Sequence, residues 1–345
     1  MPSAVATRDH HPSKSSRPRG KSAAASVESV VIPKNEKSVE VAVAGRTVTL
    51  TNLQKPFWPE LGITKGGLIQ YYADVAPVLL PHLRDRAMVM KRYPHGAHGE
   101  FFFMKRAPTP RPEWIQTCSI EHESENIIDF PMIQDLPALL WVINLGCIDL
   151  NPWYARCDDV DRPDFLHFDL DPVSPVKGGK SVPFERVLEV SLIVRDALDH
   201  LGMPSYAKTT GSRGIHVYVP VVRGPTQKQV WTFAKAFAQM MAKQSPATIT
   251  AEYKIAKRPQ GRVLVDYNQN AWGRTLSSLY SVRPRKDAPV SMPVTWKEIE
   301  KGITIEQFTM KNARQRIKKL GDLWTPLLPD QQPRVDLMKH LQGVK

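Results

Sequence analysis

The order of strand-forming and helix-forming segments limits the fold of this chain more than any other feature. Short apolar runs that alternate with polar residues predict strands, and longer segments with apolar residues every three or four positions predict helices. The two kinds of segment follow one another here without the regular strand, helix, strand alternation that builds a parallel sheet. We therefore predict an α+β fold with a mixed, largely antiparallel sheet flanked by helices, and an N-terminal α/β subdomain.

The predicted elements cover most of the chain. We expect a hairpin at 41–50 and strands near 87–94, 100–106, 126–133, 165–171, 205–210, 215–222 and 262–267. We expect helices from Thr64 to about Leu80, near 135–146, from Pro183 to Leu201, and from Thr226 to about Lys243. Thr64 is a typical N-cap, and Gly202 is a typical residue after a helix end.

Composition divides the chain into three parts. Residues 1–40 are rich in Ser, Ala, Pro, Lys and Arg without apolar periodicity, which predicts a disordered basic tail. The folded domain is expected at 41–330, and a C-terminal tail at 331–345. Within the folded domain we expect an N-terminal part at 41–160, the central sheet at 161–290 and C-terminal helices at 291–330.

The net charge of +13 indicates a polyanionic partner. The first 40 residues contain seven Lys and Arg and four Asp and Glu, so most of the excess belongs to the folded domain. This favours a nucleic-acid-binding groove over a sticky tail, although a lysine-rich solvated surface is the alternative. No run of 18 apolar residues and no apolar signal segment occurs, so we expect no membrane contact and a cytoplasmic, nucleoid location.

The three cysteines predict neither a disulfide framework nor a zinc site. Cys118, Cys147 and Cys157 are odd in number and lack paired short spacings. We expect ordinary thiols.

Two carboxylates lie two positions apart in the apolar segment HFDLDP at 167–172. Side chains alternate across a strand, so Asp169 and Asp171 should share one face, about 7 Å apart. Two carboxylates among apolar neighbours repel each other and resist burial unless a cation lies between them. Mg²⁺ or Mn²⁺ suits such hard oxygen ligands. The alternative is a pair that faces solvent or caps the next loop.

A second pattern is the small-residue turn in TTGSRGIHVYVP at 209–220. Gly211 and Gly214 permit a tight turn whose backbone N–H groups could face a phosphate, and Arg213 and His216 could add charge-assisted donors. The alternative is an ordinary hairpin.

A third acid, Asp266, ends the apolar strand of RVLVDYNQN at 262–270. An isolated aspartate at a strand end usually caps a turn. Together with Asp169 and Asp171, however, it completes the set of groups used for phosphoryl transfer by two metal ions.

Seven motifs form a recognisable set. They are LQKPFWPELGITKGGLIQYYADVAPVLLPHL (53–83), KRYPHGAHGEFFFMKRAP (91–108), NPWYARCDDVDRPD (151–164), HFDLDP (167–172), TGSRGIH (210–216), VDYNQN (265–270) and LYSVRPR (279–285). In this order they resemble the polymerase module of bacterial DNA ligase D, within the archaeo-eukaryotic primase superfamily. The resemblance covers roughly residues 40–330. It implies a primase-polymerase fold and a nucleotidyltransferase that extends DNA ends or fills gaps with NTPs or dNTPs.

The resemblance also implies roles for individual residues. The metal ligands and catalytic residues would be Asp169, Asp171 and Asp266, holding two Mn²⁺ or Mg²⁺ ions. The nucleotide site would contain Thr210, Gly211, Ser212, Arg213, Gly214, His216 and Arg283. The DNA-binding residues would lie in the N-terminal part: Lys55 and Lys65 on a 5′-phosphate across a gap, Phe102 or Phe103 on the template, and Lys105. Since strand residues alternate, Phe101 and Phe103 should share a face opposite to Phe102.

The chain departs from the ligase-linked pattern at three points. Asn151 precedes Pro-Trp where that module usually has His, and the turn begins Thr-Thr-Gly in place of Thr-Ser-Gly. No K-x-D-G ligase motif occurs, so we expect a polymerase without ligase activity, with a Ku-type end-binding protein and a separate DNA ligase as candidate partners. The alternatives are a de novo primase, a metal-dependent nuclease and a non-catalytic DNA-end-binding repair factor.

Overall fold

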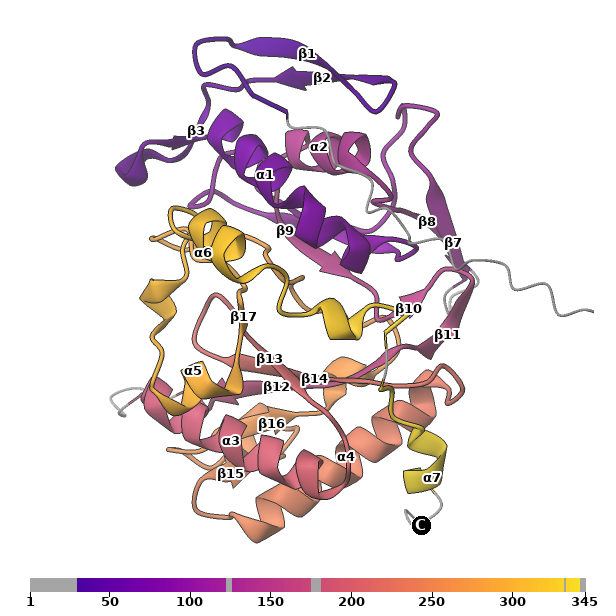
Figure 1. The fold of residues 1–345 in the computed structure, drawn as a ribbon, viewed down its shortest axis with the longest axis vertical. Helices are drawn as coiled ribbons and strands as arrows, with labels where there is room; N and C mark the ends of the chain where they lie inside the picture. Colours follow the sequence, from indigo (N-terminus) through magenta and orange to yellow (C-terminus); the bar gives the residue numbers. More distant parts are fainter. Residues whose placement is uncertain (1–29, 122–125, 175–180, 332, 342–345) are drawn as a thin grey trace, which may run out of the picture.

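The computed structural model describes residues 30–121, 126–174, 181–331 and 333–341 (Figure 1). The central sheet lies in the lower part of Figure 1, and most N-terminal elements lie above it. The six strands occur in the spatial order β15 (Ile249–Thr250), β16 (Val263–Asp266), β12 (Phe165–Pro172), β14 (Ile215–Pro220), β13 (Tyr206–Thr209) and β17 (Pro293–Val294). Every neighbouring pair except β15 and β16 is antiparallel, which confirms the predicted α+β fold.

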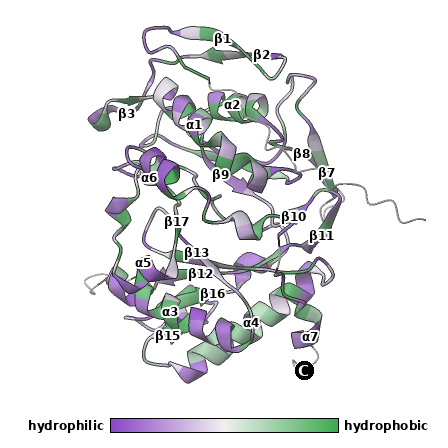
Figure 2. Cartoon of the chain, viewed as in Figure 1, coloured by the Kyte–Doolittle hydropathy of each residue, from purple (hydrophilic) through white to green (hydrophobic). Residues whose placement is uncertain are grey.

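Two helices cover one face of this sheet, α3 (Phe184–His200) and α4 (Gln227–Gln244). Both carry hydrophobic and hydrophilic positions, as amphipathic helices on a sheet should (Figure 2). The even-numbered residues of β12 point toward them, since the ring of Phe168 lies 4.8 Å from that of Phe237 of α4, centre to centre. The odd-numbered residues, among them Asp169 and Asp171, therefore face the other side of the sheet.

The N-terminal elements pack around α1 (Lys65–Leu83) and α2 (Leu136–Asn144). The Thr64 side chain caps α1 by accepting from the amide of Gly67, as predicted. A three-stranded sheet joins β6 (Phe102–Met104), β5 (Met88–Arg92) and β9 (Cys147–Pro152). The hairpins are β1 (Ser38–Val43) with β2 (Arg46–Thr51), β3 (Pro56–Trp58) with β4 (Ile63–Thr64), β7 (Thr117–Glu121) with β8 (Ile127–Pro131), and β10 (Ala155–Arg156) with β11 (Asp159–Pro163).

At both ends of the chain, buried residues extend into the segments that composition predicts as tails. Val30 and Ile32 are buried, and the side chain of Gln70 bonds to both backbones, so the N-terminal boundary at residue 40 was placed too late. Residues 1–29 of the predicted tail lie outside the described residues. Near the C-terminus, Val335 and Leu337 are buried, and short helix α7 (Leu337–Leu341) packs on α4. Both boundaries depend on apolar contacts that form only in the folded state, so composition alone does not reveal them.

The C-terminal region also contains α5 (Trp296–Glu300) and α6 (Ala313–Leu320). One continuous cluster of buried apolar side chains runs through the N-terminal elements, the sheet and this region. None of the described helices is long and apolar enough to cross a membrane.

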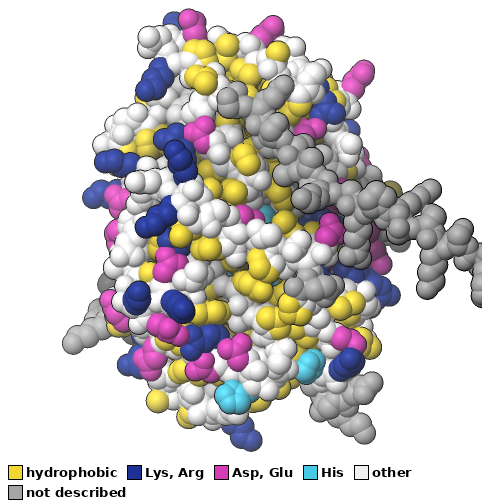
Figure 3. All heavy atoms as spheres, in the orientation of Figure 1, with side chains coloured by type: hydrophobic (Ala, Val, Ile, Leu, Met, Phe, Trp, Pro, Cys, Tyr) yellow, Lys and Arg dark blue, Asp and Glu magenta, His cyan; other side chains and the backbone are white. Residues whose placement is uncertain are grey.

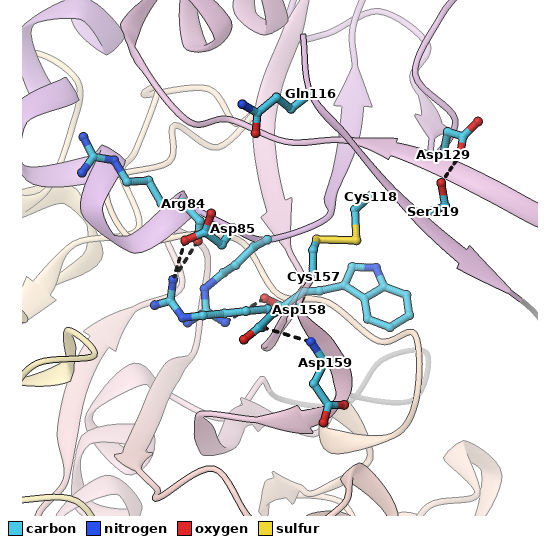
Figure 4. The surroundings of a disulfide bond; sticks show 12 residues. Arg84, Asp85, Gln116, Cys118, Ser119, Asp129, Cys157, Asp158 and Asp159 are labelled. Atoms are coloured by element: carbon cyan, nitrogen blue, oxygen red, sulfur yellow. Dashed lines mark hydrogen bonds and ion pairs between the residues drawn. A yellow bond between two sulfur atoms is a disulfide. The ribbon is translucent and has the colours of Figure 1, made fainter.

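The expectation of three ordinary thiols was wrong. Cys118 of β7 and Cys157, in the β10–β11 turn, form a disulfide with Cα atoms 5.8 Å apart (Figure 4). The two residues are 39 positions apart, and it is the packing of two separate hairpins that brings them together, which no local spacing reveals. Cys147 is a buried free thiol whose pKa is raised by burial.

Candidate active site

Strand register places four polar side chains in one row across the sheet. Asp169 lies directly opposite Asp266 on one side and His216 on the other, and His216 lies opposite Lys208. Residues directly opposite each other in an antiparallel pair point to the same face. Asp171, two residues after Asp169, points the same way. The predicted common face of the two aspartates is therefore confirmed, and the strand of Asp266 is their immediate neighbour.

This face forms the floor of a cavity of about 620 Å³. Most of the predicted nucleotide and metal residues line it, together with Phe103 and Lys105 from β6 and the segment after it. Six cationic side chains and three carboxylates lie in its wall. They are Lys91, Lys105, Arg213, Arg274, Arg283 and Arg285, with Asp149, Asp169 and Asp171. By contrast, Lys, Arg, Asp and Glu are interspersed on the face seen in Figure 3.

The surroundings of the Asp169 and Asp171 carboxylates favour the binding of a cation. Burial, followed by the negative charge of Asp266, raises the pKa of Asp169 to about 7. Burial, followed by repulsion from Asp169, raises the pKa of Asp171 to about 7. Among the described residues, the buried Oδ1 of Asp169 has no hydrogen-bond partner, although His216 Nε2 lies 3.2 Å away. Buried carboxylate oxygens that repel one another suit a hard divalent cation as their binding partner.

The carboxylate of Asp266 is turned toward its own loop. It accepts from the amide of Asn268 at 2.8 Å and from the side chain of Gln269 at 3.2 Å. In the described part of the chain, no three His, Cys, Asp or Glu side chains form a metal-binding group. Asp266 therefore needs a side-chain rotation to share a cation with Asp169, and its role as a ligand stays a prediction.

The turn at 210–214 is held together by the Thr210 hydroxyl. Its oxygen accepts hydrogen bonds from the amides of Ser212 and Gly214, each at 3.1 Å. The prediction that backbone N–H groups of this turn face a phosphate is therefore wrong for these two amides, because the preceding threonine uses them. Thr210, Ser212, Arg213 and His216 nevertheless line the cavity, so the side chains remain available.

The two glycines of the turn are needed for close packing. A Cβ at Gly214 would lie 2.5 Å from Asp171 Oδ1 and 2.6 Å from the carbonyl oxygen of Leu170. Gly211 has a φ of +63°, and a Cβ there would lie 2.6 Å from Cγ of Arg283. The absence of a side chain thus lets the turn lie directly against the aspartate strand and Arg283.

Arg283 is fixed from two sides. Its Nη1 donates to the carbonyl oxygen of Thr210 at 3.1 Å, and its Nε lies 3.3 Å from Oδ2 of the buried Asp149. Arg213 is held by Ser174, whose hydroxyl accepts from Nη2 at 3.0 Å. Both guanidinium groups line the cavity and can meet a polyphosphate.

Several cavity residues carry no sequence signal that we recognised. Asp149 comes from β9 and Lys91 from β5, whose segment reads only as a strand. Asn151 of β9, which replaces the usual His of the ligase-linked pattern, also lines the cavity. Lys208 at the end of the polar row was also missed. A charged residue inside an otherwise apolar strand, two positions before the glycine turn, is the signal that could have revealed it.

The aromatic run at 101–103 is solvent-exposed. Phe101 and Phe103 contact each other edge to face at 5.9 Å, and Lys91 Nζ lies 4.0 Å from the centre of Phe101, which confirms their common face. Phe103 is 59% exposed and lines the main cavity. Phe102 lies beside Arg92, 5.2 Å from its guanidinium carbon. Of the two rings predicted to meet a template, Phe103 faces the cavity.

Lys55 and Lys65 meet in a second cavity of about 250 Å³. Arg92 adds a third cation and Asn52 a polar side chain to its wall. Lys65 is 5% exposed and donates to the carbonyl oxygen of Thr51 at 2.6 Å, so it is not solvated surface. Burial, followed by repulsion from Lys55, lowers the pKa of Lys65 to about 8. Three converging cations, with no carboxylate among the described residues of the wall, suit a phosphate.

Comparison with known proteins shows the family of the chain. The model of the LigD primase-polymerase domain matches residues 64–324. The multifunctional non-homologous end joining protein LigD of Mycolicibacterium smegmatis is 31% identical over 82% of this chain and 36% of its own length. The bifunctional LigD of Bacillus subtilis is 30% identical over 79% of this chain and 42% of its own length. The chain thus spans less than half the length of these relatives.

A solved structure is also similar. The polymerase domain of Mycobacterium tuberculosis ligase D, in complex with DNA, superposes with a TM-score of 0.75 and 30% identity, over 83% of this chain and 99% of that domain. The largely antiparallel sheet and this structural similarity place the chain in the primase-polymerase class. More specifically, the chain belongs to the LigD primase-polymerase domain family.

Proposed function

We propose that this protein is a template-directed nucleotidyltransferase that extends DNA 3′ ends and fills short gaps with NTPs or dNTPs. The observation that carries the proposal is the placement of Asp169 and Asp171 on the floor of a cavity with six cations and an exposed phenylalanine in its wall. Carboxylates serve phosphoryl transfer, cations hold a triphosphate, and a ring face accepts any base.

We assign each side chain a role from its place in the cavity. Arg213, Arg283 and His216 would bind the triphosphate and offset its charge as the phosphoryl bond breaks. The buried Asp149 would keep the Arg283 guanidinium directed into the cavity. Phe103 and Lys105, at the rim, would hold the template base and backbone.

Asp169 and Asp171, with Asp266 after rotation, would hold two Mn²⁺ or Mg²⁺ ions. Bound there, such ions supply activation of the primer 3′-hydroxyl and neutralisation of the departing pyrophosphate. The protein contributes a rigid strand pair that keeps the acids together against their own repulsion.

The second cavity would bind the 5′-phosphate on the far side of a gap. Lys55, Lys65 and Arg92 provide the charge, and Asn52 can add a hydrogen bond. Recognition of that phosphate would select gapped or broken DNA over intact duplex. The relatives named as non-homologous end joining proteins suggest the same repair process here, with a Ku-type end-binding protein and a DNA ligase supplying the steps before and after extension.

Extension of a labelled primer across a short gap tests this function. We expect incorporation with NTPs or dNTPs, and tighter binding when the downstream strand carries a 5′-phosphate. Removing that phosphate should also make the remaining affinity less sensitive to salt, because fewer counterions are released on binding. Equal binding with and without the phosphate would refute the role of the second cavity.

Two reactions that each omit one component, together with a DNA-binding measurement, separate the alternatives. Product formed from template and NTPs alone would indicate de novo priming. Mononucleotides released without added NTP would indicate a nuclease. DNA binding without either product would indicate a non-catalytic end-binding factor and would refute the proposal.

A further inference from the structure

Lys208 is a buried lysine beside the active site. Its side chain is 0% exposed, and it lies at the end of the polar row, directly opposite His216. Burial, followed by the charge of Arg283, lowers its pKa well below the usual value. Burying an amine costs free energy unless its hydrogen bonds are satisfied, so the contacts of Nζ show what the residue does.

The amine of Lys208 has three close partners. The carbonyl oxygen of Ser277 lies at 2.9 Å, the hydroxyl oxygen of Ser291 at 2.6 Å and Nδ1 of His216 at 2.7 Å. Ser277 can only accept through its carbonyl. Ser291 donates its own proton to the carbonyl oxygen of Thr209 at 2.9 Å, so toward Lys208 it accepts. These two bonds fix the position of Nζ, and its remaining direction points at His216.

The contact with Lys208 occupies one edge of the His216 ring. With Nδ1 engaged, Nε2 is the ring nitrogen that lies 3.2 Å from Oδ1 of Asp169, and both residues line the cavity. A rotation of the ring by half a turn would break the short Nδ1 contact and leave the buried amine without its third partner.

We propose that Lys208 is a positioning residue that locks the His216 ring with Nε2 directed into the nucleotide site. The inference rests on the proposed function for the identity of the ligand, a nucleoside triphosphate, and on the structure alone for the lock. Lys208 does not touch the ligand. It acts through His216.

A double-mutant cycle on nucleotide binding separates this role from a general structural one. Lys208→Met keeps the length of the side chain and removes the hydrogen bond. We expect it to weaken triphosphate binding by about 10-fold, the scale of one hydrogen bond. In the His216→Ala background the same change should have less than about a 2-fold effect, because its target is gone. Lys228→Met, an exposed lysine on α4, is the matched control. Equal effects of Lys208→Met in both backgrounds would overturn the proposal.

A second measurement needs neither nucleotide nor activity. In nitrogen-15 spectra of histidine side chains in the free protein, the two ring nitrogens of His216 should give the separate signals of a single tautomer. In Lys208→Met these signals should shift and average. An averaging ring in the wild-type protein would overturn the proposal even if the variant failed to fold. If the ring is locked but no primer is extended, the proposed function fails and the lock stands.

Discussion

At the scale of single residues, the site contains acidic and basic side chains whose charged forms are disfavoured by burial. A bound ligand of opposite charge would stabilise those charged forms. Asp169 and Asp171 have pKa values near 7 because they are buried next to other acids, and Lys65 has a pKa near 8 because it is buried next to another cation. Each of these three side chains lines a cavity. Such groups are typical of functional sites, since a ligand of opposite charge relieves the strain.

The lowered pKa of Lys65 predicts a pH dependence of phosphate recognition. Lys65 is charged below about pH 8 and loses its proton above it. The gain in DNA affinity from a downstream 5′-phosphate should therefore be about 10-fold at pH 7 and smaller at pH 9. Lys65→Arg, which stays charged throughout, is the control and should show a flat profile. A constant gain in the wild-type protein would contradict this assignment. The measurement is fluorescence anisotropy with phosphorylated and unphosphorylated gaps.

Gly214→Ala should damage the site through Asp171. The added Cβ would lie 2.5 Å from the carboxylate oxygen, so the turn or the aspartate must move. We expect primer extension to fall by at least about 10-fold, in line with overpacking by 1–3 kcal/mol. Gly224→Ala, where a Cβ meets nothing within 4 Å, should behave like the wild-type protein. Full activity of Gly214→Ala would show that the turn is not held against the aspartate.

At the scale of elements, β6 presents two different surfaces to its surroundings. Phe103 faces the main cavity, and Phe102 lies on the opposite side near Arg92. Strand alternation predicted this division, but the sequence could not tell which ring faces the site, because that depends on how β6 pairs with β5.

Phe103→Ala should weaken binding of a primer-template by about 1–3 kcal/mol, the usual contribution of one stacked base. Phe102→Ala should change it much less, and it is the matched control on the same strand. The substrate should lack a downstream strand, so that the second cavity does not contribute. Equal losses for the two variants would mean that the template lies elsewhere.

Local patterns predicted the elements of the sheet but not the register between them. The helix at Thr64 and the strands of Asp169, His216 and Asp266 follow from capping and alternation, and each lies where expected. The rotation of Asp266 toward its own turn and the use of turn amides by Thr210 do not follow, since they depend on hydrogen bonds chosen in the folded state.

At the scale of the whole molecule, one core joins the N-terminal elements to the sheet, so the two cavities are held on a common framework. The fold class was predicted from the order of elements, whereas the disulfide was not, because it joins two hairpins 39 residues apart. Pairings at that distance are fixed by tertiary packing, which one sequence does not display.

The disulfide predicts a redox-dependent stability. Reduction of Cys118–Cys157 frees a loop of 39 residues in the unfolded chain, and should lower the free energy of unfolding by about 2–4 kcal/mol. The measurement is denaturant unfolding with and without a reductant. A Cys118→Ser, Cys157→Ser variant should not respond to the reductant, whereas Cys147→Ala should still respond. An unchanged wild-type stability would contradict a stabilising role.

The most direct test of the central claim is primer extension by the Asp169→Ala, Asp171→Ala variant with Mn²⁺ or Mg²⁺ present. We expect extension to disappear while DNA binding persists, because the cationic walls and Phe103 are untouched. Asp199→Ala, an exposed acid near the end of α3, is the control and should extend normally. Undiminished extension by the double variant would contradict the account.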